Sequence, residues 1–85
     1  MILRITESVV CGTRLLRLTF NDGTRKTVDV TPLLSGPVFE PLCNPQFFAR
    51  AQLDRECGTV VWPNGADFAP EALRDLAAVE EPSTV

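Results

Sequence analysis

One stretch of ten residues in the C-terminal part of the chain holds most of the side chains that could recognise a ligand. It contains Trp62, Asn64, Gly65, Asp67 and Glu71. An indole can stack on a ligand, an amide can donate and accept hydrogen bonds, and a carboxylate can accept them. These five residues are therefore the candidate binding surface. They also fit a structural role, in which Asn-Gly turns the chain, the indole covers the core and Asp67 accepts from backbone amides.

Acid–base catalysis would require two carboxylates to work as a pair. Asp67 and Glu71, or Asp54, would have to meet in one pocket with their pKa values driven apart. The spacing of these acids in the sequence does not require their side chains to lie in one pocket. The chain contains no histidine, which removes Ser-His-Asp and Cys-His arrangements and every His-ligated metal site. We therefore predict a protein that is not an enzyme and has no catalytic residue.

The three cysteines are Cys11, Cys43 and Cys57. Their odd number and wide spacing resemble neither a disulfide framework nor a paired metal-binding motif. We expect reduced thiols, no bound metal and no other cofactor. Cys57 falls in a predicted turn without an adjacent histidine or paired cation that would favour its thiolate, so we expect an ordinary surface thiol.

Four basic residues gather on the first predicted hairpin, namely Arg14, Arg17, Arg25 and Lys26. A two-stranded ribbon with such side chains can read DNA. The other interpretation is a solvated strand face whose charges discourage edge-to-edge pairing. The formal net charge of −3 argues against nucleic acid as the main partner and fits a basic protein partner better. A mildly acidic surface also keeps small domains soluble.

A chain of 85 residues can form one hydrophobic core and not two. We expect a single domain over residues 1–78 and a flexible tail over 79–85, where the sequence becomes polar and contains proline. No segment has the roughly 20 apolar residues of a membrane span, and the first residues lack the order of a secretory signal. These features predict a cytoplasmic protein. Homo-oligomerisation could accompany any function, because edge strands need cover.

The N-terminal half predicts three strands. Residues 2–10 are rich in β-branched side chains, with Leu3, Ile5 and Val9 expected on one face. A second strand is expected over 15–20, where apolar and polar residues alternate again. A third strand follows the Asn-Asp-Gly turn at 21–23.

The length of that turn follows from the parity of the strands it joins. Opposed residues of an antiparallel pair share a face. A two-residue loop would place Leu16 opposite Asp29, whereas a three-residue loop places it opposite Val28 and Arg17 opposite Thr27. We therefore predict a three-residue hairpin with its glycine in the left-handed conformation of a bulge.

The rest of the chain predicts short helices and a second hairpin. Helical turns are expected over 38–42 and 44–50, the latter capped by Asn44 with Pro45 at its first position. The hairpin pairs 51–54 with 59–62. The apolar residues expected in the core of this half are Phe39, Leu42, Phe47, Phe48, Leu73, Leu76 and Ala77.

The last three of these belong to a terminal helix expected over 70–78. The predicted fold class is therefore α+β: a mainly antiparallel sheet of about five strands, made of two hairpins and the N-terminal strand. It packs against short helices and the C-terminal helix.

Several consecutive motifs resemble one known family. They are the Asn-Asp-Gly turn, Val-Asp-Val at 28–30, Pro-Val-Phe-Glu-Pro-Leu at 37–42 and Val-Trp-Pro-Asn-Gly-Ala-Asp at 61–67. Together they are similar to the bacterial domain-of-unknown-function family 2442, over about residues 2–76. The resemblance implies a compact α+β domain without an established activity. Some relatives carry an added helix-turn-helix domain, for which this chain has too few residues after Leu76, and others are encoded beside putative toxins.

Three hypotheses for function follow. The leading one is a non-enzymatic protein-interaction module, antitoxin-like or regulatory, acting on a partner encoded in the same small bacterial operon. The alternative is a small-molecule-binding domain that uses the 62–67 loop. The third is weak DNA binding by the first hairpin.

Overall fold

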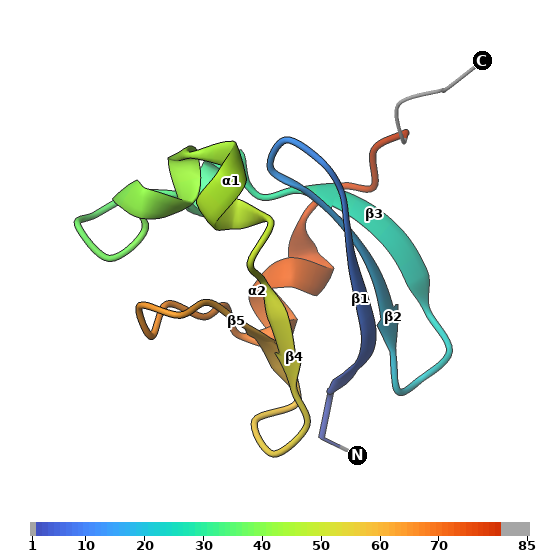
Figure 1. Ribbon diagram of the computed structural model, residues 1–85. Helices are drawn as coiled ribbons and strands as arrows, with labels where there is room; N and C mark the ends of the chain where they lie inside the picture. Colours follow the sequence, from blue (N-terminus) through green and yellow to red (C-terminus); the bar gives the residue numbers. More distant parts are fainter. Residues whose placement is uncertain (1, 81–85) are drawn as a thin grey trace.

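The strands form two antiparallel sheets (Figure 1). The larger sheet has the order β1 (Ile5–Gly12), β2 (Leu15–Phe20), β3 (Arg25–Asp29). The smaller one pairs β4 (Gln52–Asp54) with β5 (Thr59–Val61). The computed structural model describes residues 2–80. Within that range the α+β class and the five antiparallel strands are confirmed, whereas the expected single sheet is wrong.

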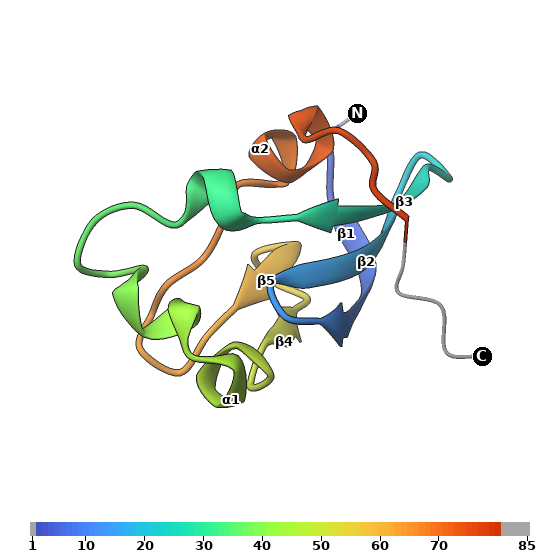
Figure 2. The same ribbon diagram turned by 90° about the horizontal axis from the view of Figure 1, so that it is seen from above.

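In the described range, four short helices lie between and after the strands: η1 (Thr31–Leu33), η2 (Glu40–Cys43), α1 (Pro45–Phe48) and α2 (Pro70–Asp75). In Figure 2, α1 and α2 lie on opposite sides of the strands. The predicted cap of α1 is confirmed, because the Asn44 side chain accepts from the backbone N–H of Gln46 at 2.9 Å. No helix among residues 2–80 has the length and apolar character needed to span a membrane.

One hydrophobic cluster joins both sheets and the helices. Of the predicted core residues, Leu42, Phe48 and Leu73 are buried, while Phe39 and Phe47 are half-buried against the cluster. The fully enclosed members are Leu16, Leu18, Phe20, Val28, Val30, Leu42, Phe48, Val60 and Leu73.

The first hairpin has the predicted three-residue turn. The backbone N–H of Phe20 donates to the carbonyl of Thr24 at 2.8 Å, and Leu16 lies opposite Val28. Gly23 has a φ of +89°, as a left-handed bulge position requires. Parity and turn chemistry were therefore sufficient to predict the register.

The expected inward position of Val9 is wrong. The pairing of β1 with β2 shifts between Ile5 and Glu7, so that Thr6 is an extra residue. Such a bulge reverses the side to which the following residues point, here up to the second register shift after Val10. Val10, opposite Leu16, is consequently half-buried, and Val9 is 39% exposed.

The terminal helix ends at Asp75, three residues before the expected end. The chain then becomes extended, with Ala78 bridging to Val28 and the Val79 N–H donating to the Thr27 carbonyl at 2.8 Å. Lys26 donates from Nζ to the carbonyls of Arg74 and Leu76. Pairing with β3 thus replaces the last helical turn, leaving Leu76 half-buried and Ala77 exposed. Of the predicted tail, residues 81–85 lie outside the described range.

Gly58→Ala is expected to lower the free energy of unfolding by about 2–4 kcal/mol, because it combines backbone strain with a clash. Gly58 has a φ of +69°, and a Cβ there would lie 2.8 Å from Cγ of Arg4. Gly65→Ala is the matched control, since Gly65 has a φ of +87° with no atom within 4 Å, and should cost about 1 kcal/mol. Urea titration measures both. Equal losses would contradict the proposed contact with Arg4.

Candidate functional site

The 62–67 loop is itself a tight hairpin. The Trp62 N–H donates to the Ala66 carbonyl and the Gly65 N–H to the Trp62 carbonyl, both at 2.9 Å. Val61 also bridges to Asp67. This is the bonding pattern of the first hairpin, with Pro-Asn-Gly in place of Asn-Asp-Gly. The loop therefore continues the β4–β5 hairpin as a rigid extension.

Trp62 points into the core. Its side chain is 3% exposed and packs against Phe48 and Phe68, with ring centroids 5.5 and 5.4 Å away. The indole N–H donates to the Phe48 carbonyl at 2.9 Å. Both the ring faces and the polar atom are therefore engaged inside the protein.

Asn64 is also engaged within the fold. Its Nδ2 donates to the Val38 carbonyl at 2.9 Å, and its Oδ1 accepts from the Ala66 N–H at 3.1 Å. The amide thus ties the 62–67 loop to the segment before η2. This geometry favours the structural interpretation of both Trp62 and Asn64.

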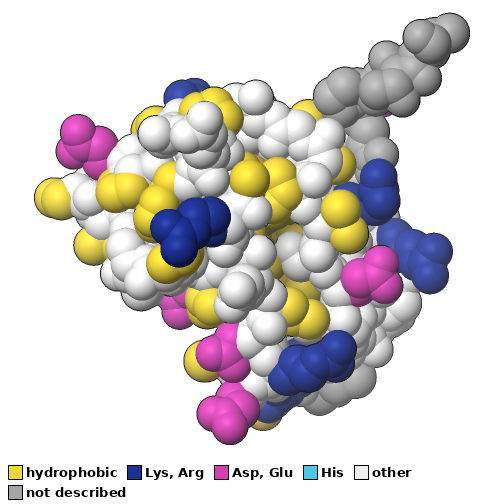
Figure 3. Space-filling model, viewed as in Figure 1, with side chains coloured by type: hydrophobic (Ala, Val, Ile, Leu, Met, Phe, Trp, Pro, Cys, Tyr) yellow, Lys and Arg dark blue, Asp and Glu magenta, His cyan; other side chains and the backbone are white. Residues whose placement is uncertain are grey.

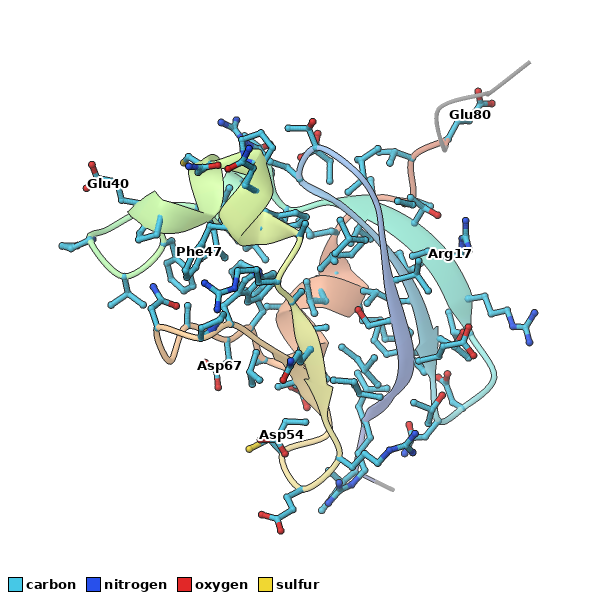
Figure 4. The ribbon with its side chains drawn as sticks, viewed as in Figure 1. Arg17, Glu40, Phe47, Asp54, Asp67 and Glu80 are labelled. Carbon is cyan, nitrogen blue, oxygen red and sulfur yellow. The ribbon has the colours of Figure 1, made fainter. Side chains whose placement is uncertain are left out.

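The two candidate acids Asp67 and Glu71 are exposed. Figure 4 shows Asp67 directed away from the core. Asp54 accepts from the backbone N–H groups of Glu56 and Cys57 at 2.9 and 3.1 Å, and these bonds lower its pKa. Asp54 therefore stabilises its own turn through both hydrogen bonds.

Cys57 is an exposed thiol beside this turn. The negative charge of Asp54 is the largest cause that raises the pKa of the Cys57 thiol, with burial and Asp67 adding to it. The thiolate is the reactive form, so the surroundings of Cys57 suppress its reactivity.

Asp54→Asn is expected to speed the alkylation of Cys57 by iodoacetamide at neutral pH. Removing the carboxylate lowers the pKa of the thiol and enlarges its thiolate fraction, while the amide oxygen can still accept the two turn hydrogen bonds. Mass spectrometry of the labelled peptides gives the rate. Cys43, the other exposed thiol, is the internal control and should react at an unchanged rate. An unchanged rate at Cys57 would rule out the electrostatic effect of Asp54.

The four basic residues of the first hairpin do not share one face. Arg17 and Arg25 occupy the outer side of the larger sheet, where Figure 4 shows Arg17. Lys26 lies opposite Leu18, on the inner side, and its ammonium caps α2. Arg14 lies in the β1–β2 turn with a φ of +61°. These four residues were the candidate basic face, and the structure does not place Lys26 on it, because Lys26 lies opposite the core residue Leu18.

Two hollows adjoin each other on the outer face of the β4–β5 hairpin and α1. The first, of about 300 Å³, is lined by Arg50, Gln52, Val61, Trp62 and Pro63. The second, of about 280 Å³, is lined by Asn44, Gln46, Phe47 and Arg50. Arg50 belongs to both and, among residues 2–80, is the only charged residue in either lining. We call this surface the Arg50 face. In Figure 3, hydrophobic side chains surround a patch of Lys/Arg colour over this part of the molecule.

The Arg50 guanidinium is held over an aromatic ring. Its central carbon lies 6.0 Å from the centroid of Phe47, at the limit of a cation–π contact. It makes no ion pair with any residue between 2 and 80. No hydrogen bond to another residue between 2 and 80 engages this guanidinium either, so its N–H donors are available to a molecule that occupies the hollows.

A third hollow, of about 350 Å³, lies between the start of η1 and the segment after α2. Its lining is mainly apolar, with Asp29 as its charged residue. Asp29 already accepts from the Thr31 hydroxyl at 2.6 Å and the Thr31 N–H at 2.9 Å, which lowers its pKa. The carboxylate is thus committed to the turn that starts η1.

Sequence reasoning did not identify Arg50 as a site residue. One signal was present: Arg50 is the only Lys or Arg between Lys26 and Arg55. That signal does not say which segments surround the side chain. The lining comes from residues 44–52 and 61–63, which only the folded chain brings together.

Comparison with known proteins identifies the family and nothing closer. Neither the curated proteins nor the solved structures gave a match to this chain. The model of one family, described as a protein of unknown function (DUF2442), matches residues 7–78. The match covers most of the chain and confirms the resemblance inferred from the Asn-Asp-Gly and Trp-Pro-Asn-Gly motifs. This chain therefore belongs to the DUF2442 family.

Proposed function

We propose that this domain is a non-enzymatic protein-interaction module that binds its partner through the Arg50 face. The observation that carries the proposal is the pair of adjoining hollows, which share one cation that has no ion-pair partner and no charged neighbour in the lining among the described residues. Val38, 53% exposed, adds apolar surface nearby, because Asn64 ties it to the loop that contains Pro63. Apolar and amide groups around one arginine are typical of the centre of a protein interface.

The partner in this proposal is the product of a neighbouring gene, on which the domain acts as an antitoxin-like or regulatory subunit. An acidic chain with net charge −3 suits a partner that is basic overall. Ligand binding by the 62–67 loop has less support, because the Trp62 and Asn64 side chains are engaged internally. DNA binding by the first hairpin has less support because Lys26 faces inward.

Co-expression of the tagged chain with each product of the flanking genes tests the proposal. We expect one product to co-elute in a fixed ratio. Gln52→Trp should abolish this co-elution, because a large ring on exposed Gln52 fills the first hollow. Arg25→Trp is the matched control on the outer side of β3 and should bind normally. If no flanking product binds, or if Gln52→Trp binds as well as the unaltered chain, the proposal is wrong.

A further inference from the structure

We infer that the Arg50 face recognises a carboxylate on a partner segment, held by Arg50 between two apolar neighbours of that carboxylate. This inference rests on the proposed function and specifies the chemistry of the same site. It concerns one acidic side chain, or one chain end, within a partner of any overall charge.

Charge complementarity supports a carboxylate as the occupant. In the described part of the chain, Arg50 is the only ionised group that lines the two hollows, and the other lining residues are amides or apolar. A guanidinium presents a planar fork of N–H groups that matches the two oxygens of a carboxylate. Since no described carboxylate pairs with Arg50, the protein leaves this fork available.

The surroundings of Arg50 would orient such a contact. The ring of Phe47 lies against one side of the guanidinium. This contact restricts the rotamers of Arg50 before binding, so less conformational entropy is lost when a ligand binds. The two hollows beside the guanidinium offer apolar surface. Val61 and Pro63 provide it in the first hollow, and Phe47 provides it in the second. A peptide with its carboxylate at Arg50 could therefore place one apolar residue in each hollow.

Amide side chains add selectivity for a peptide over a free ion. Gln52 lines the first hollow and Gln46 the second, and both are exposed. They can donate to and accept from a peptide backbone on either side of the carboxylate. An inorganic anion would use only Arg50. The expected ligand is thus an apolar–acidic–apolar segment of a protein.

The test uses the full chain and a displayed library of random heptapeptides. Selection on the unaltered protein should enrich peptides that have Asp or Glu between apolar residues. Fluorescence anisotropy then gives the Kd of the most enriched peptide and of its version with the amide in place of the acid. We expect Arg50→Gln to weaken binding of the acidic peptide at least about tenfold. Arg50→Lys should also weaken it, because an ammonium lacks the planar fork.

Arg25→Gln is the matched control, since Arg25 is an exposed arginine on the outer side of β3 and should leave the Kd unchanged. A melting temperature equal to that of the unaltered protein shows that Arg50→Gln folds. The inference is overturned if no acidic position is enriched, or if Arg50→Gln binds the selected peptide as tightly. One result would separate the two proposals. If a flanking-gene product fails to bind Gln52→Trp but binds Arg50→Gln normally, this inference is wrong and the proposed function stands.

Discussion

Trp62→Ala is expected to lower the free energy of unfolding by about 3–5 kcal/mol, one of the largest losses that a single side chain of this domain can cause. The substitution empties a site bordered by the rings of Phe48 and Phe68. It also removes the donor that bonds the buried Phe48 carbonyl. Because Trp62 is the only tryptophan and the chain has no tyrosine, urea unfolding should be followed by far-ultraviolet circular dichroism.

Two further variants separate the contributions of Trp62. Trp62→Phe keeps an aromatic ring but loses the indole N–H, so we expect a smaller loss of about 1–3 kcal/mol. Glu71→Ala, an exposed residue of the same candidate surface, should stay within about 0.5 kcal/mol. A loss below about 1 kcal/mol for Trp62→Ala would show that the indole is dispensable for packing. The binding interpretation of Trp62 would then be preferred.

Leu73→Ala is expected to lower the free energy of unfolding by about 2–5 kcal/mol. The helix α2 has six residues, and isolated helices shorter than about 12–15 residues are marginal in water. Leu73 is its fully buried side chain. Removing that anchor should loosen the whole segment that covers one side of the strands (Figure 2). Urea unfolding gives the loss, and hydrogen exchange of the α2 amides locates it.

The control for Leu73 is a second leucine near the end of the same segment. Leu76 is half-buried and lies outside the helix, so Leu76→Ala should cost clearly less than Leu73→Ala. Polar contacts also hold this segment, including Lys26 on the Arg74 carbonyl and the Arg74–Asp22 ion pair at 2.5 Å. If Leu73→Ala were as mild as Leu76→Ala, these polar contacts and not burial would be what keeps α2 in place.

The proposed binding surface, the Arg50 face, depends on hydrogen bonds within the fold. Its two hollows lie on elements that are short but tied at several points. Asn44 caps α1, Trp62 bonds the Phe48 carbonyl, and Asn64 bonds the Val38 carbonyl. Trp62 and Asn64, which were expected to contact a ligand directly, instead hold the loop that forms one wall of the first hollow.

Local chemistry was enough to predict several elements of the fold. The three-residue turn at 21–23 followed from strand parity and a glycine at the bulge position, and both are properties of neighbouring residues. The Asn44–Pro45 start of α1 is local for the same reason. The bulge at Thr6 was not predictable in this way, because the alternation of apolar and polar residues does not indicate where an extra residue is inserted. It turned Val9 outward against expectation.

What the sequence by itself determined is therefore the family, the fold class, the two hairpins and the place of the Trp-Pro-Asn-Gly loop. Tertiary structure decided what that loop does, because the partners of Trp62 and Asn64 lie 14 and 26 positions away. It also decided where α2 ends, since Lys26 donates to the carbonyls of Arg74 and Leu76 while the Val79 N–H donates to the Thr27 carbonyl on the edge of β3. The surroundings of Arg50 depend on tertiary structure for the same physical reason. The hollows form between segments that are distant in sequence, and short-range patterns do not encode which segments meet.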